Sequence, residues 1–496
     1  MSTLKISDGV VKDEILVLGL ASTNSKGGIA IEAGDMALDT KTILSQLADM
    51  GATGKADEVV KLPGSHVRLL VFTGLGKKNS AYPHEVLRRA AGSAARALAG
   101  NSAATFSLPA KSLAEVSAVA EGAALGAYSF TEFRGSTKDD YKLPLKTITV
   151  HSKLAASADA KAAVVRAAVV AKYTYLVRDL INTPPSHLTP DSFTKKLSAV
   201  VKAAGGAKAG LKIQIWDEKQ LKTQGFGGIV GVGQGSANPP RLLHISYTPK
   251  GKAAKRYAFV GKGITFDTGG LALKPAAGME AMKSDMSGAA AVSAAVIAIA
   301  ELKLPVAIES WAPLAENMPS DTATRPSDII TIFGGKTVEV LNPDAEGRLV
   351  LADALMKAQS SKNKLDGIID VATLTGAQVV ALGTRTSAVM TNNQDFSDAF
   401  MKVTAISGEQ FWPMPLPEEL RASLDSPVAD LANIGDRMGG MLVAGLFLKD
   451  FVNPELPWLH LDIAGPAYNE AKPHGYTPVG GTGIALRSLV TLAEQA

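Results

Sequence analysis

Two segments, the first of them rich in glycine, carry most of the residues whose types and spacing could do chemistry. Residues 260–270 read VGKGITFDTGG and are followed by Lys274 and Asp285, and residues 340–349 read VLNPDAEGRL. Both segments crowd carboxylates beside a lysine or an arginine, and glycines let the backbone approach a ligand closely. Crowded carboxylates repel one another, and a divalent cation relieves that repulsion. The two segments therefore predict a metal site built from Asp, Glu and Lys.

Five side chains are the candidate metal ligands. They are Lys262, Asp267, Asp285, Asp344 and Glu346. Four carboxylates and one lysine could hold a pair of ions, and an oxygen-rich set without thiolates suits Mg, Mn or Zn. A lysine ligand must be neutral, so the metal would have to depress its pKa strongly. Two ions about 3.5–4 Å apart could share a water, lower its pKa and present it to a bound carbonyl.

Simpler interpretations compete for two of these residues. Asp285 precedes a helical pattern over residues 287–300 and could be the N-cap of that helix. Lys262 could instead bind phosphate, but Gly263 follows it where a P-loop requires Ser or Thr. The phosphate interpretation is therefore disfavoured, whereas the N-cap remains an alternative for Asp285.

The second segment also has two interpretations. Asp344, Glu346 and Arg348 alternate in what we expect to be an extended loop, which would aim all three side chains to one side. They could instead begin a helix and form a surface ion pair.

Other catalytic arrangements find little support. None of the seven histidines lies in either segment, the chain has no cysteine, and neither GxSxG nor HExxH occurs. The glycine-rich piece at residues 231–236 lacks the third glycine of a dinucleotide fingerprint, and Pro239 and Pro240 follow it, so we interpret it as a tight turn.

The sheet of an α/β fold is expected to position these residues. Short apolar runs of strand type alternate with helical patterns, which is typical of an α/β fold. Catalytic groups in open α/β sheets gather beyond strand ends, so the predicted strand at residues 257–260 would bring Lys262 and Asp267 to a crevice. Predicted strands lie at residues 15–20, 68–72, 147–151, 212–216, 242–247, 257–260, 307–311, 336–340 and 367–371. Predicted helices lie at residues 83–98, 112–124, 157–180, 287–300 and 349–358.

The length of 496 residues favours two domains. The long helical pattern at residues 157–180 ends at a segment, residues 182–190, whose three prolines forbid continuation. We expect an N-terminal α/β domain at residues 1–155 and a linker helix at residues 156–182. Residues 183–496 would form a larger C-terminal catalytic α/β domain, in which helices flank a mixed central sheet.

Composition predicts a cytoplasmic protein without nucleic-acid or membrane partners. The net charge is only +4, and the densest basic run, residues 252–256, has no interleaved aromatic residues. The first ten residues lack the apolar core of a signal peptide. The longest apolar stretch, residues 289–300, is far shorter than the roughly 20 residues that a membrane span requires.

At the motif level the chain resembles the leucyl aminopeptidase family, also called cytosol aminopeptidases. The resemblance rests on residues 260–270 and 342–349, with further matches at residues 316–320 (ENMPS), 372–376 (ATLTG) and 460–465 (HLDIAG). It covers roughly residues 180–496. The family signature has Thr where this chain has Pro343, and because that side chain is not a ligand in the family we expect only a local backbone adjustment.

The resemblance implies a role for each site residue. Asp267 and Glu346 would bridge two metals, Lys262 and Asp285 would complete one site, and Asp344 would complete the other through its side chain and carbonyl oxygen.

The same resemblance implies residues that act on the substrate. Lys274 would face the scissile carbonyl, and Arg348 would hold a bicarbonate ion that acts as general base. The pocket for the first side chain would be lined by Met282, Thr373, Thr375 and Ala464.

These roles imply a metal-dependent aminopeptidase that releases N-terminal residues from peptides, with Leu and similar residues preferred. The family further implies two Mn or Zn ions per subunit, with Co or Mg as alternatives, and a hexamer formed as a dimer of trimers. Three rival functions are a DNA-binding regulator, a scaffold that has lost catalysis and a dipeptidase for Cys-Gly or similar substrates. The weak net charge argues against the first, and the intact set of site residues argues against the second. The sequence does not exclude the third.

Overall fold

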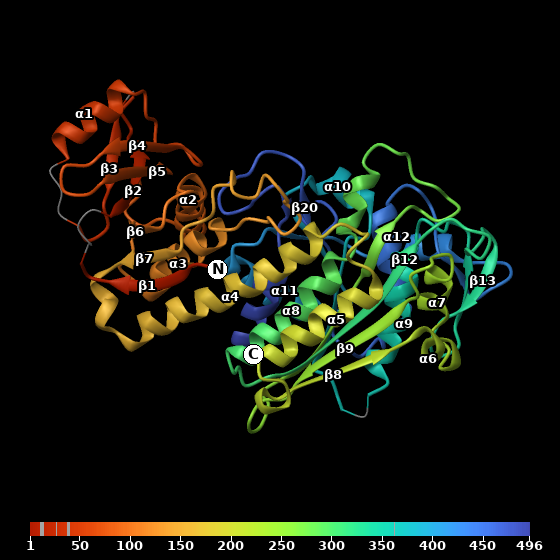
Figure 1. Cartoon of the computed structure of the whole chain (residues 1–496). Coiled ribbons are helices and arrows are strands. Elements are labelled where there is room, and N and C mark those ends of the chain that lie inside the picture. The colour runs from red at the N-terminus through yellow and green to blue at the C-terminus, as the bar shows by residue number, and fades with distance from the viewer. Residues whose placement is uncertain (10–13, 26, 37–39, 362) are drawn as a thin grey trace. The chain divides into compact units, whose positions relative to one another are not determined.

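The computed structural model describes residues 1–9, 14–25, 27–36, 40–361 and 363–496 (Figure 1). The chain forms two compact units, Met1–Tyr175 with Asn469–Val479, and Leu176–Tyr468 with Gly480–Ala496. The division falls within helix α4 (Ala158–Asn182), which is the long helix expected from the sequence. The division into compact units falls between the two predicted domain limits, residues 155 and 182. It does not test either limit, so both stay predictions.

The first unit is built on a mixed sheet. Its described residues form seven strands in the order β1-β7-β6-β2-β5-β4, with β3 paired to β2. The strand bounds are β1 (Thr3–Ser7), β2 (Ile15–Ser22), β3 (Ile29–Glu32), β4 (Val59–Pro63), β5 (Leu69–Lys77), β6 (Ala103–Ser107) and β7 (Thr147–His151). Helices α1 (Lys41–Asp49), α2 (His84–Ala97) and α3 (Leu113–Gly126) accompany it. Strand β2 is apolar and almost wholly buried, as expected for a central parallel strand.

The second unit contains the larger sheet, with strand order β17-β16-β19-β15-β10-β12-β9-β8 and β11 paired to β12. Strands β19, β15, β10 and β12 are parallel, whereas β16 and β9 join them antiparallel on either side. The bounds are β8 (Leu211–Trp216), β9 (Arg241–Tyr247), β10 (Arg256–Gly261), β11 (Gly263–Asp267), β12 (Ala307–Asn317), β15 (Gly367–Ala372), β16 (Ser387–Thr391), β17 (Phe411–Pro413) and β19 (Trp458–Asp462). The prediction of a mixed central sheet flanked by helices is confirmed.

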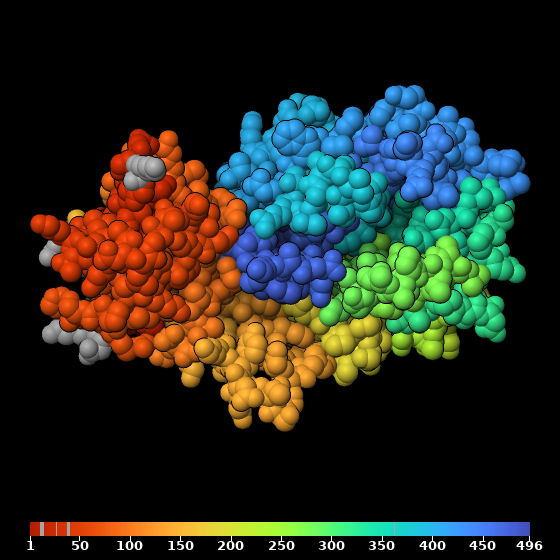
Figure 2. Space-filling view, turned by 90° about the horizontal axis from the view of Figure 1, so that it is seen from above, coloured from red at the N-terminus to blue at the C-terminus, as the bar shows by residue number. Residues whose placement is uncertain are grey.

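Helices cover both faces of this sheet. Helix α8 (Ser287–Glu301) packs on β10, β12 and β15, and α13 (Leu486–Glu494) packs on α8. The C-terminal residues, dark blue, reach the surface beside cyan segments of the same unit (Figure 2). Helices α7 (Gly227–Gly233), α9 (Gly347–Gln359) and α12 (Gly440–Lys449) share a second hydrophobic core with the sheet.

Four further helices and two small sheets are also described. The remaining helices are α5 (Pro190–Ala203), α6 (Glu218–Thr223), α10 (Gly376–Leu382) and α11 (Gln394–Ser407). Strands β13 (Asp328–Thr331), β14 (Thr337–Val340) and β18 (Leu431–Ala432) form a small separate sheet. The two-residue strands β20 (Tyr468–Asn469) and β21 (Gly480–Gly481) lie near the end of the chain.

Every predicted strand and helix is present, but three expectations need correction. The apolar segment that contains α8 is longer than predicted: the helical stretch Met279–Glu301 could cross a membrane by length and composition, yet 94% of its apolar window is buried within the protein. The glycines at residues 231–233 end helix α7, so only the residues after them form the expected turn. Helix α9 begins at Gly347, which places Arg348 in its first turn and not in an extended loop.

A buried carboxylate ties α9 to its neighbours. Asp353 on α9 is fully buried, and its two oxygens accept the backbone N–H groups of Ile229 and Phe333, each at 2.7 Å. Burial raises the pKa of Asp353 to about 7, although the backbone hydrogen bonds oppose this rise. The carboxylate therefore links α9 to α7 and to the turn after β13, at the cost of desolvating a charge.

This carboxylate predicts a pH dependence of stability. The pKa of Asp353 is about 7 in the folded state, whereas its ordinary value, which applies to the unfolded chain, is 3.8. Between these two pH values the folded state therefore binds more protons than the unfolded state. The contribution of Asp353 to the free energy of unfolding therefore falls as the pH rises through this window and is constant above it.

The substitution Asp353→Asn should remove this pH dependence and, by leaving a backbone N–H without an acceptor, lower the free energy of unfolding by about 1–3 kcal/mol. Thermal unfolding at pH 5 and pH 8 measures both effects. The exposed Asp321→Asn is the matched control and should leave both quantities unchanged. An equal pH response of wild type and Asp353→Asn would contradict the assignment.

Candidate active site

The predicted site residues meet beyond the ends of neighbouring strands of the larger sheet. Lys262 lies between β10 and β11, and Asp267 ends β11. Asp285 follows the 3₁₀ helix η3 (Met279–Ser284), and Asp344 and Glu346 lie in the loop between β14 and α9. Lys262 lies at the carboxyl end of the parallel strand β10, where the sites of open α/β sheets gather, and the loop after β14 and the 3₁₀ helix bring the other three acids to it from outside the larger sheet.

Lys262 is buried at the centre of the cluster. Its Nζ lies 2.8 Å from Asp285 Oδ2 and 2.9 Å from Glu346 Oε1, and it donates a hydrogen bond to the Thr373 carbonyl oxygen at 3.0 Å. Burial lowers the pKa of Lys262, but the charges of Asp285, Glu346 and Asp267 together outweigh burial and raise this pKa above its ordinary value. The ammonium therefore acts as the counter-ion of the buried carboxylates.

Lys274 neutralises the other side of the cluster. Its Nζ lies 2.8 Å from Asp267 Oδ2 and also contacts Asp344 Oδ1. Burial lowers the pKa of Lys274, whereas the nearby carboxylates, Asp267 first, raise it above its ordinary value. Unlike Lys262, whose side chain is 4% exposed, the Lys274 side chain is 21% exposed and so can be reached from solvent.

The cluster holds more negative than positive charge. Four carboxylates face two ammonium groups. Burial first, and repulsion from neighbouring acids second, raise the pKa of Glu346 to about 8, and burial together with Asp267 raises the pKa of Asp285 to about 6. One oxygen each of Asp267, Asp344 and Glu346 lie within 4.8 Å of one another. This arrangement of oxygen ligands around uncompensated charge suits a divalent cation.

The structure rules out the simpler interpretations of two predicted residues. Asp285 is not the N-cap of α8, because that position is occupied by Met286, and the Asp285 carboxylate is directed to Lys262 and to the Thr373 hydroxyl. Glu346 is 2% exposed, so it cannot belong to a surface ion pair.

Arg348 is a buried cation with spare donors. Its Nη1 donates to the carbonyl oxygen of Asn433 at 2.8 Å, but its buried Nε has no hydrogen-bond partner within the described part of the chain. Burial lowers the pKa of Arg348 to about 10, against the opposing effects of Glu346 and Asp462. An unsatisfied buried guanidinium N–H fits a small anion, so the expected bicarbonate is compatible with these surroundings.

Comparisons with known proteins agree with this geometry. Residues 175–490 match the model of the cytosol aminopeptidase family, catalytic domain, and residues 17–137 match the N-terminal domain of the same family. The chain belongs to the cytosol aminopeptidase family. It is 51% identical to a probable cytosol aminopeptidase of Streptomyces griseus, with 98% of this chain and 96% of the relative covered. A probable cytosol aminopeptidase of Micrococcus luteus is 50% identical, with 90% and 89% covered.

Solved structures give the same result. The bottromycin maturation enzyme BotP in complex with Mn is 35% identical, with a TM-score of 0.85 and 97% of this chain and 99% of that chain covered. A mutant of tomato leucine aminopeptidase is 28% identical, with a TM-score of 0.84 and 100% and 97% covered. The chain is therefore a peptidase of the leucyl aminopeptidase type, and the expected family, fold class and enzyme class are confirmed.

The predicted pocket residues of this aminopeptidase lie around two carboxylates. The Thr373 hydroxyl donates to Asp285 Oδ1 at 2.7 Å. The Thr375 hydroxyl donates to Asp462 Oδ2 at 2.8 Å, and the Ala464 N–H donates to Asp462 Oδ1 at 3.2 Å. Met282 lies in the 3₁₀ helix that leads to Asp285, and its side chain is partly exposed. Their contact with a substrate side chain stays a prediction.

Sequence reasoning missed two asparagines that hold the site together. Asn317 Nδ2 donates to Asp267 Oδ1 at 2.8 Å and to the Pro343 carbonyl oxygen at 3.1 Å, so it joins the two catalytic segments. Its place within the ENMPS match was the available signal. Asn433 Oδ1 accepts the N–H groups of Leu341 and Asn342 at 2.9 and 3.1 Å, but no motif marks this residue.

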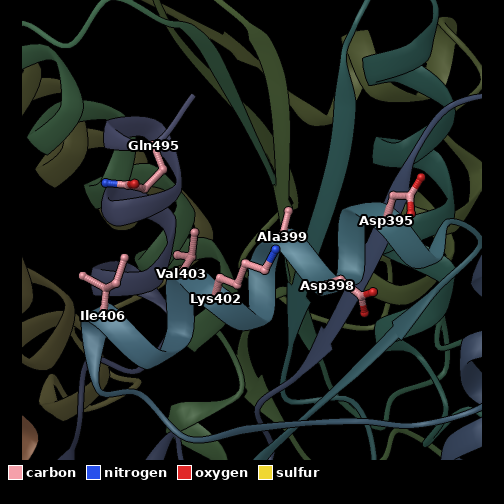
Figure 3. Close-up of a pocket in the computed structure, with 7 residues that line it drawn as sticks. All are labelled: Asp395, Asp398, Ala399, Lys402, Val403, Ile406 and Gln495. Atoms are coloured by element: carbon pink, nitrogen blue, oxygen red, sulfur yellow. The ribbon is translucent and has the colours of Figure 1, made fainter. Parts of the chain in front are cut away.

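A separate pocket of about 470 Å³ lies along α11 (Figure 3). It is lined by Asp395, Asp398, Ala399, Lys402, Val403, Ile406 and Gln495. All but Gln495 come from this one helix, and the charged residues of the lining are Lys402, Asp395 and Asp398. No predicted site residue lines it.

The double contact of Asn317 predicts an effect on catalysis. Asn317→Leu keeps the branched shape of the side chain but removes both hydrogen bonds, so Asp267 and the 341–345 loop lose their link. We expect kcat/KM for leucine-p-nitroanilide to fall roughly 10–100-fold, the usual effect of losing a group that orients a ligand. Asn363→Leu, at an exposed position, serves as control. Unchanged kcat/KM in a folded Asn317→Leu protein would show that the link is dispensable.

Proposed function

We propose that this aminopeptidase depends on two divalent metal ions and removes N-terminal residues from peptides, with Leu and similar residues preferred. The observation that carries the proposal is the buried excess of carboxylates around Lys262 and Lys274. The metal ligands would be Lys262, Asp267, Asp285, Asp344 and Glu346. Mn and Zn are the expected metals, with Co and Mg as alternatives, and the Mn complex of the related enzyme BotP supports the first.

The charges of the cluster support the ligand set. Lys262 is charged here because three carboxylates raise its pKa. A dication among the same carboxylates would reverse that effect and release the proton, which leaves a neutral nitrogen as a ligand. Bound metal ions would supply Lewis acidity and activate water for attack on a carbonyl.

The residues around the metals would bind and polarise the peptide. Lys274 carries a charged ammonium that solvent can reach, so it can donate to the scissile carbonyl oxygen as negative charge develops there. Arg348 would hold bicarbonate, which would supply a general base, and the free Nε–H of Arg348 supports this assignment.

Specificity would come from the free amine and from the first side chain of the substrate. A neutral α-amine can ligate a metal, whereas an acylated amine cannot, so cleavage would be restricted to the N-terminus. We propose that the first side chain enters a pocket lined by Met282, Thr373, Thr375 and Ala464. We further propose that the protein acts in the cytoplasm as a hexamer, in keeping with its family, and sedimentation analysis would measure the assembly.

Hydrolysis of leucine-p-nitroanilide, compared with its N-acetylated form, tests metal dependence and exopeptidase specificity together. After chelation we expect no cleavage of either substrate. Restored Mn²⁺ or Zn²⁺ should recover cleavage of the free-amine substrate alone, because the acetyl group removes the amine ligand. Activity that survives chelation, or equal cleavage of both substrates, would contradict the proposal.

The role of Lys274 gives a second test. Lys274→Ala should lower kcat by roughly 10²–10³-fold with a smaller change in KM, because its donor would act mainly on charge that develops in the transition state. Steady-state kinetics at matched metal content measures this split. Lys252→Ala, in an exposed turn, is the control. A change confined to KM would instead assign Lys274 to substrate binding.

A further inference from the structure

Another pocket is lined by residues of β11 and β12, the strands that carry the proposed metal ligand Asp267 and its partner Asn317. It has a volume of about 490 Å³ and belongs wholly to the larger unit. Its lining residues are Pro185, Ser186, Thr189, Gly235, Ser236, Ala237, Asn238, Phe266, Glu316, Met318 and Pro319. None of the predicted catalytic or metal-binding residues is among them, and the glycine-rich segment at residues 231–236 forms part of its wall.

Strand alternation separates this pocket from the catalytic cluster. On β11, Asp267 contacts Lys274, whereas the preceding Phe266 lines the pocket. On β12, Asn317 donates to Asp267, whereas the preceding Glu316 lines the pocket. Successive side chains of a strand point to opposite sides, so the two strands serve the cluster with one face and the pocket with the other.

Glu316 is an incompletely compensated charge in this pocket. It is 7% exposed, and its Oε2 accepts hydrogen bonds from the Ser236 hydroxyl and, at 2.9 Å, from Asn238 Nδ2. Within the described part of the chain, Oε1 has no hydrogen bond and no Lys or Arg pairs with Glu316. A carboxylate this deeply buried normally has a cationic partner. Glu316 is also the only ionisable residue in the pocket lining.

The remaining lining residues indicate the shape of the missing partner. Phe266, Met318, Pro185 and Pro319 provide an apolar wall beside the carboxylate. An inorganic cation would leave this wall in contact with water, whereas an amine with a short hydrocarbon body would cover it. Because Glu316 Oε1 is a hydrogen-bond acceptor, an N–H-bearing ammonium suits it better than a quaternary one.

We propose that this pocket is a second, non-catalytic site that binds a primary ammonium compound carrying a short apolar group, with its ammonium on Glu316. Free amino acids and short peptides with apolar first residues belong to this chemical class. The ligand would bind beside the residues that precede Asp267 and Asn317, so its occupancy could be sensed at the catalytic cluster. The site requires no metal, so it does not depend on the catalytic proposal.

Equilibrium dialysis of labelled isoamylamine against the Mn-loaded full chain tests the site. We expect isoamylamine to bind the wild type and its affinity to fall at least tenfold in Glu316→Gln. Gln keeps the acceptor for Ser236 and Asn238 but removes the charge. Glu309→Gln, on the same strand but paired with His244, is the matched control and should retain the wild-type affinity. The uncharged analogue isoamyl alcohol should compete poorly.

A second variant protects the test against misfolding of Glu316→Gln. Ala237→Phe fills the pocket from an exposed position and should abolish isoamylamine binding at this site while circular dichroism stays unchanged. Repeating the dialysis without Mn separates this site from amine binding at the metals, since only the latter should disappear. Equal binding of isoamylamine by the wild type and both variants would show that the proposal is wrong. Displacement of isoamylamine by KCl, but not by NaCl at the same ionic strength, would also overturn it, because the pocket would then select an inorganic cation.

Discussion

The structure of the larger unit is governed by the need to hold four carboxylates in one place, three of them buried and the fourth, Asp344, partly exposed. Lys262 and Lys274 compensate only part of that charge. Both form ion pairs at 2.8–2.9 Å, and Lys274 also makes a closer contact to Asp344. Removing one partner of such a group leaves a buried charge unpaired, which is far more costly than losing a surface pair. The cluster can therefore exist only where the surrounding backbone fixes every member.

The sheet and one helix provide this rigidity. Strands β10 and β11 place Lys262 and Asp267, and helix α9 begins directly after Glu346. Helix α9 is itself anchored to α7 and to the turn after β13 by the buried carboxylate of Asp353. Asp353 is thus a further desolvated acid near the cluster, and its hydrogen bonds position helix α9 and the catalytic loop that precedes it. The free-energy cost of desolvating Asp353 is partly offset by these hydrogen bonds.

How far the sequence predicts this arrangement depends on the range of the interactions. Strand and helix positions followed from local apolar periodicity, and the site residues followed from two contiguous motifs and a family resemblance. The helical placement of Arg348 was missed because a short acidic segment fits a loop or a helix start equally well. The role of Asn433 was missed because it lies about 90 residues from the loop it supports, and no local pattern encodes such a contact. The extra length of the apolar helix was missed because Met279–Ser284 carries charged residues that mask its continuity with α8.

The departure of Pro343 from the family signature can be understood from the hydrogen bonds of its loop. Asn433 binds the N–H groups of Leu341 and Asn342, while the Asn342 side chain and carbonyl accept from Asp344 and Ala345. Position 343 is thus the one place between residues 341 and 345 where these hydrogen bonds require no N–H, and proline lacks only that donor. Its carbonyl oxygen remains available and accepts from Asn317. A fixed φ at this position also reduces the freedom of the unfolded loop, so proline favours the conformation that presents Asp344 and Glu346.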